Sequence, residues 1–182
     1  MTPRGADSFQ IRCVGGWPGR AKAGDRLSGL GLKLAIGAVA ATGLVACGGP
    51  EYVSVVPPEP TGVSVEECAD LLDALPRLVL DGQMRDVEPR NALAAAWGDP
   101  AVVLRCGVER PAQLEPSSPC LVANDVGWFT DEGSDSEVVF TTIGRSTYVE
   151  VTVPDAYPQP GGALAELAQA ISGSTTELQP CV

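Results

Sequence analysis

Histidine is missing from this chain of 182 residues, and lysine does not recur after Lys33. The catalytic dyads and triads that activate a serine or cysteine need a base that titrates near neutral pH, and histidine or a buried lysine usually supplies it. Hydrolases of that kind are therefore nearly excluded. The carboxylates remain as the main acid–base groups, and we expect the protein not to be an enzyme.

A hydrophobic run long enough to span a membrane is also missing from the N-terminal part of the chain. Residues 34–46 form an uncharged run of 13 residues, whereas a membrane-spanning helix needs about 20. The charges that precede this run are six basic and two acidic. A basic segment followed by an apolar run of this length is typical of a signal peptide. We therefore expect residues 1–46 to be a signal peptide.

The apolar run ends at Leu44-Val45-Ala46-Cys47, which resembles the lipobox of bacterial lipoproteins. In that class of signal the cysteine thiol receives a diacylglyceryl group, and a peptidase cuts the chain just before it. We expect Cys47 to be the lipid-anchored, palmitate-bearing first residue of the mature protein, on the outer side of the cell membrane. The alternative is a cleaved secretory signal, or a short N-terminal anchor, without a lipid.

The mature chain is strongly acidic. It keeps 6 basic residues, all arginine, and 21 acidic ones, a net charge of about −15. Such a domain should be repelled by nucleic acid and by the surface of an anionic lipid membrane. We expect the partners to be the membrane, through the lipid on Cys47, and an envelope protein or glycan. Residues 47–62 contain four prolines and are predicted to be a tether, and residues 63–182 an extracytoplasmic domain.

Four cysteines remain in that domain, and an exported domain with four cysteines predicts two disulfides. They are Cys68, Cys106, Cys120 and Cys181. Zinc sites show close cysteine pairs, often with histidine, so we expect neither a metal nor a cofactor. Of the three connectivities we expect Cys106–Cys120, which closes a short loop, and Cys68–Cys181, which ties down the C-terminus.

Hydrophobic periodicity predicts a helix, three to four short strands and a second helix. The expected elements are a helix from Ser64 to Leu75 with Ser64 and Glu67 as a capping box, a helical turn at 92–97, strands at 101–108, 121–129, 138–143 and 147–153, and a helix at 163–171. Hairpin connections then indicate a small α+β domain, with a mainly antiparallel three- to four-stranded sheet packed by an N-terminal and a C-terminal helix. Residues 78–91 fit neither pattern.

One group of short motifs resembles a known family. The motifs are Trp97-Gly98-Asp99-Pro100, Leu104-Arg105-Cys106-Gly107-Val108, Gly144-Arg145 and Tyr148-Val149-Glu150-Val151, with Cys68 and Leu75-Pro76 upstream. Over roughly residues 65–181 the chain is similar to actinobacterial lipoproteins and secreted proteins classed as a domain of unknown function. The resemblance implies an envelope location and a disulfide-bearing domain, and it implies no activity.

Five residues are candidates for ligand or partner contacts, and for four of them we favour a structural alternative. Asp99 could be one of a pair of catalytic carboxylates, but it is more typical of a turn before proline. Arg105 could bind an anionic ligand, or form a structural ion pair. Arg145 is expected to be exposed at a hairpin tip, where it could touch a partner. Trp97 and Trp128 could form an aromatic platform, or anchor the core.

These observations favour a membrane-anchored envelope lipoprotein that acts as a non-enzymatic binding module. The alternative is a carboxylate-dependent cell-wall hydrolase, which would need a cleft with two carboxylates about 5–10 Å apart. A binding module would instead show an exposed apolar patch of several hundred Å², and a purely structural tether would show neither.

Overall fold

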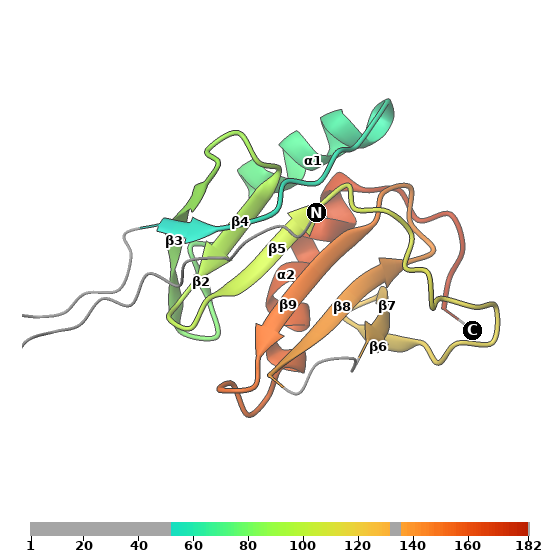
Figure 1. The fold of residues 1–182 in the computed structure, drawn as a ribbon. Coiled ribbons are helices and arrows are strands. Elements are labelled where there is room, and N and C mark those ends of the chain that lie inside the picture. Colours follow the sequence, from blue (N-terminus) through green and yellow to red (C-terminus); the bar gives the residue numbers. More distant parts are fainter. Residues whose placement is uncertain (1–51, 132–135, 182) are drawn as a thin grey trace, which may run out of the picture. The chain divides into compact units, whose positions relative to one another are not determined.

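The computed structural model describes residues 52–131 and 136–181 (Figure 1). The predicted signal peptide and Cys47 lie outside the described residues. Among the helices that are described, none is long and apolar enough to span a membrane.

Nine strands and two helices make up the described part of the chain. The strands are β1 (Tyr52–Ser54), β2 (Leu78–Val79), β3 (Gly82–Glu88), β4 (Ala94–Trp97), β5 (Val102–Cys106), β6 (Leu121–Ala123), β7 (Val126–Asp131), β8 (Glu137–Ile143) and β9 (Val149–Pro154). The helices are α1 (Val63–Ala74) and α2 (Gly161–Ser174).

The strands form one mixed sheet, so the predicted sheet of three to four strands is wrong. Its order is β1-β3-β4-β5-β9-β8-β7-β6, and β2 pairs with β3 off this path. The pairing of β1 with β3 is parallel, and the other pairings are antiparallel. β1 and β6 therefore lie at opposite edges.

The strands that the sequence pattern missed have physical reasons for being inconspicuous. β4 consists of three alanines and a tryptophan, and alanine has a low propensity for strands. In this fold all four residues are buried, and packing against their neighbours outweighs that low propensity. β2 and β3 are joined by a tight turn in which Leu80 and Asp81 have positive φ angles. The Asp-Gly pair that often marks such turns is present at Asp81-Gly82, but it is shifted by one residue, and leucine at the first central position seldom adopts a positive φ. The predicted strand 121–129 is two strands, because Asn124 and Asp125 form a turn with positive φ angles.

One face of the sheet carries the core, and both helices pack on that face (Figure 1). In β5 and β9 alternate residues are fully buried, as their valine-rich alternation predicted. From α2, Leu164, Leu167 and Ile171 are fully buried against them. The opposite, outer face carries half-buried residues of the same strands, among them Arg105 and Glu150.

The domain has two disulfides, but the predicted pairing is wrong. Cys68 pairs with Cys106 at a Cα–Cα distance of 5.5 Å, and Cys120 pairs with Cys181 at 6.0 Å. The predicted pairing rests on a short local loop and on the need to tie down the C-terminus, and neither reason depends on how the elements pack. In the fold α1 packs on the core face near β5, so Cys68 meets Cys106, while Cys120 immediately precedes edge strand β6, where the C-terminal segment passes.

Candidate functional site

The Trp97-Gly98-Asp99-Pro100 motif forms a structural turn after β4. Trp97 is fully buried, and its indole N–H donates to the carbonyl of Pro76 at 2.9 Å. Gly98 has φ +73°, and a side chain there would meet the Tyr157 hydroxyl, which donates to the carbonyl of Pro100 at 2.8 Å. Asp99 has a side chain 76% exposed, 3.8 Å from Arg85. The motif thus carries packing and turn geometry rather than a cleft.

Arg105 on β5 forms an ion pair with Glu150 on β9. Its Nε and Nη2 donate to Oε1 of Glu150 at 2.9 and 2.7 Å, and its Nη1 donates to the carbonyl of Val56 at 3.3 Å. The two side chains keep 28% and 17% of their exposure. This arrangement favours the structural alternative, because the guanidinium already binds a carboxylate of the same sheet.

Arg145 is buried, with only 8% of its surface exposed, so its expected exposure is wrong. Its Nε donates to the Thr175 hydroxyl at 2.6 Å, and its Nη2 donates to the carbonyls of Thr175 and Ser172 at 2.6 and 3.3 Å. These carbonyls belong to the end of α2, where helices leave acceptors without internal partners and favour a cation. Arg145 therefore caps α2.

The two candidate tryptophans do not form an aromatic platform at the surface. Trp128 on β7 is fully buried, as is Trp97. The Trp128 indole N–H is buried and has no hydrogen-bond partner among the described residues. Both side chains belong to the hydrophobic core.

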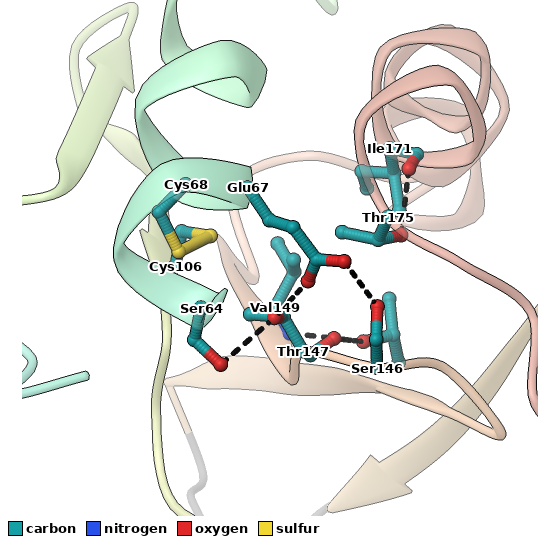
Figure 2. Close-up of a disulfide and its surroundings, with 10 residues drawn as sticks. Ser64, Glu67, Cys68, Cys106, Ser146, Thr147, Val149, Ile171 and Thr175 are labelled. Carbon is teal, nitrogen blue, oxygen red and sulfur yellow. Dashed lines mark hydrogen bonds between the residues drawn. A yellow bond between two sulfur atoms is a disulfide. The ribbon is translucent and has the colours of Figure 1, made fainter. Parts of the chain in front are cut away.

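A polar cluster that the sequence reading missed joins α1 to the loop between β8 and β9 (Figure 2). Ser146 donates to one oxygen of Glu67 at 2.7 Å, and Thr147 donates to the other. Ser146 also accepts from the backbone N–H of Thr176 at 2.9 Å. The pattern Ser64-x-x-Glu67 is the sequence signal that falls on this cluster, but the capping box that it predicts does not form. α1 begins at Val63 without a side-chain cap, so Glu67 is free to reach the loop.

Residues 176–181, here called the C-terminal strap, cross the end of the β8–β9 hairpin. The backbone N–H groups of Leu178 and Gln179 donate to the carbonyl of Gly144 at 2.7 and 3.0 Å. A side chain at Gly144 would collide with the Gln179 carbonyl, and a Cβ at Gly127 would lie 2.9 Å from the sulfur of Cys181. Glycine at these two positions leaves room for the strap.

Two adjoining hollows share the strap as a wall. Their volumes are about 340 and 370 Å³, and Ile143, Gln179, Pro180 and Cys181 line both. The first also contains Arg110 and Tyr148, and the second Asp125 and Arg145. Ligand sites commonly start at about 300 Å³. Two further hollows, of 400 and 290 Å³, lie at the ends of the helices and beside β3 and β4.

Three exposed aliphatic side chains belong to β6 and the strap, although Leu121 and Val122 lie on opposite faces of the strand. Leu121 and Val122 of edge strand β6 are 44% and 55% exposed, and Leu178 of the strap is 69% exposed. We call β6, the strap and the two hollows the C-terminal corner. The corner combines apolar side chains, an open strand edge and paired hollows. Over the described ranges no group of three histidine, cysteine or carboxylate residues could hold a metal ion.

These features define a disulfide-stabilised domain with a nine-stranded mixed sheet and two helices on one face. The chain belongs to the family described as "Protein of unknown function (DUF3515)", whose model matches residues 30–180. Neither the curated proteins nor the solved structures contain a match.

Proposed function

We propose that this protein is an actinobacterial lipoprotein, anchored by lipid on Cys47, whose extracytoplasmic domain binds another envelope protein without catalysing a reaction. Two disulfides are typical of an oxidising compartment outside the cytoplasm. The four cysteines of the described domain pair with one another. Cys47 therefore has no cysteine partner in the domain, which supports its use as the lipidated residue.

The C-terminal corner is the observation that carries the binding proposal. It has exposed aliphatic side chains, of which Val122 lines the second hollow, and apolar side chains are common in the core of a protein interface. Among the described strands β6 pairs with β7 alone, so its other edge offers backbone groups that a strand of a partner protein could use. The corner is less suited to binding a glycan than a protein, because sugar rings usually stack on exposed aromatic side chains. Both candidate tryptophans are buried, and the two hollows of the corner are lined by one aromatic residue, Tyr148.

The position of the anchor supports this choice of surface. β1 begins five residues after Cys47, and five residues of extended chain span at most about 18 Å. The proposed anchor therefore holds the β1 edge near the membrane. β6 lies seven strand positions away, about 34 Å along the sheet at the usual strand spacing. The corner would be the part of the sheet directed toward other envelope components.

A carboxylate-dependent cell-wall hydrolase is the second candidate, because Asp125 and Glu177 both line the second hollow. That proposal requires purified wild-type protein to release soluble fragments from cell wall. It also requires the Asp125→Asn and Glu177→Gln variants to lose this activity. Such a result would replace the binding proposal.

Lipid attachment is tested by feeding cells a labelled palmitate. We expect the wild-type protein to carry the label and the Cys47→Ala variant to lose it completely, because the thiol is the acceptor. Protein gels with fluorescence detection, normalised to protein amount, give the readout. The absence of label in the wild type, or equal label in both, would contradict the anchor.

Partner binding is tested by photocrosslinking in intact cells. A photoreactive phenylalanine analogue replaces Val122 or Leu178, with exposed Asp70 on α1 as the control position. We expect one adduct of the same mass and identity at both corner positions, at least about fivefold stronger than at position 70. No adduct at the corner, or an equal adduct at position 70, would argue against the corner, and an adduct with glycan only would change the partner class.

A further inference from the structure

The two disulfides differ sharply in their access to solvent. Cys68 and Cys106 are fully buried, and they join α1 to β5 within the core. Cys120 and Cys181 are both half-buried. Both line the first hollow, and Cys181 lines the second as well. A thiolate that attacks a disulfide must reach one of its sulfur atoms directly, so only the second pair is open to attack in the folded domain.

We propose that Cys120–Cys181 is a site of thiol–disulfide exchange with a dithiol partner of the envelope, and that its oxidation state controls the C-terminal corner. The control of the corner rests on the proposed function, whereas the exchange itself does not. The oxidised form keeps the strap in place and the corner competent to bind. The reduced form frees the strap.

The dithiol supplies the two electrons that reduce the disulfide. One thiolate of the dithiol attacks a sulfur of Cys120–Cys181, which forms a mixed disulfide and releases the other cysteine as a thiolate. The second thiol of the partner, as its thiolate, then attacks the mixed disulfide and releases the remaining cysteine. The two released thiolates take up protons. Two electrons have passed to the protein, and the partner leaves as a disulfide.

Little besides the disulfide holds the strap. Residues 176–180 are all exposed, so they bury little apolar surface. Besides the disulfide, the described strap is held by hydrogen bonds of its backbone to Gly144 and Ser146 and by a short β-type pairing of Glu177 with Arg145. Ordering a free chain end opposes such bonds. Since Gln179, Pro180 and Cys181 form a wall of both hollows, release of the strap removes that wall from each.

The exchange is tested on the full-length protein in isolated membranes. The sample is titrated with dithiothreitol as the dithiol probe, free thiols are trapped with N-ethylmaleimide, and each cysteine is followed by peptide mass spectrometry. We expect Cys120 and Cys181 to be labelled at a dithiothreitol concentration at least about tenfold lower than Cys68 and Cys106. Labelling of all four together, or of the core pair first, would overturn the exchange site.

Control of the corner is tested by crosslinking from position 122 in the otherwise wild-type protein and in the Cys120→Ala/Cys181→Ala variant. We expect the adduct to fall at least about fivefold in the variant, while unfolding monitored by circular dichroism shows that the core persists. An unchanged adduct would overturn the control but leave the proposed function intact. No adduct in either protein would overturn the proposed function, and with it the control, and would leave the dithiothreitol result standing.

Discussion

Replacing Trp97 with alanine should lower the free energy of unfolding by about 3–5 kcal/mol, the usual cost of truncating a buried tryptophan. Trp97 is fully buried in the core cluster and ends β4. The substitution also removes the donor to the Pro76 carbonyl. Urea unfolding of the purified domain, followed by circular dichroism, measures the effect.

Asp99→Ala is the matched control within the same motif. Its side chain is 76% exposed and lies 3.8 Å from Arg85, and exposed ion pairs contribute about 0–1 kcal/mol. We therefore expect a change in unfolding free energy below about 1 kcal/mol, and an unchanged crosslink from position 122. A loss of partner binding in Asp99→Ala with normal stability would instead assign the motif a functional role.

The helices and the central strands could be predicted from the sequence because their side chains repeat with a clear period. In β5 and β9 every second residue is buried, and α2 buries Leu164, Leu167 and Ile171 on one side. β8 and β9 pair as the predicted hairpin. These elements pack through one dominant face, and a one-sided burial pattern is what periodicity detects.

The remaining strands depend on contacts between distant parts of the chain. β1 lies in a proline-rich segment predicted as tether, and it exists because residues 52–54 pair with β3, more than thirty residues later. β4 is buried on both faces, so it shows no alternation. Such strands are stabilised by their neighbours in the sheet, and local propensity is a weak guide to them.

The candidate site was hidden from the sequence for a similar reason. The C-terminal corner is assembled from β6, the β8–β9 hairpin and the strap. These parts are joined by the Cys120–Cys181 disulfide and by hydrogen bonds of the strap to the hairpin, which link residues far apart in the chain. The candidates chosen by residue type behave differently. Arg105 pairs with Glu150, and Arg145 caps α2 although it lines the second hollow. Residue type identified groups able to bind ligands, but their partners within the fold decided their roles.

Removing the core disulfide should have an effect of similar size to that of Trp97→Ala. Cys68 and Cys106 are 38 residues apart, and the chain-entropy model gives about 4 kcal/mol for a loop of that length. Because a domain is commonly stable by only 5–15 kcal/mol, Cys68→Ala/Cys106→Ala should lose a large part of its stability. Urea unfolding of the double variant against the wild type, both without reductant, measures this loss.

The Cys120→Ala/Cys181→Ala variant tests whether the loss of stability on removing a disulfide depends on the length of the loop it closes or on its location in the fold. Its cysteines are 61 residues apart, so loop length alone predicts a slightly larger loss than for the core pair. We expect a smaller loss, because the strap is an exposed chain end that can detach while the sheet and helices stay packed. The freed strap then regains conformational entropy in the native state, which offsets much of the entropy gained by the unfolded chain. An equal or larger loss would mean that the strap is part of the cooperative core, and this would argue against its release on reduction.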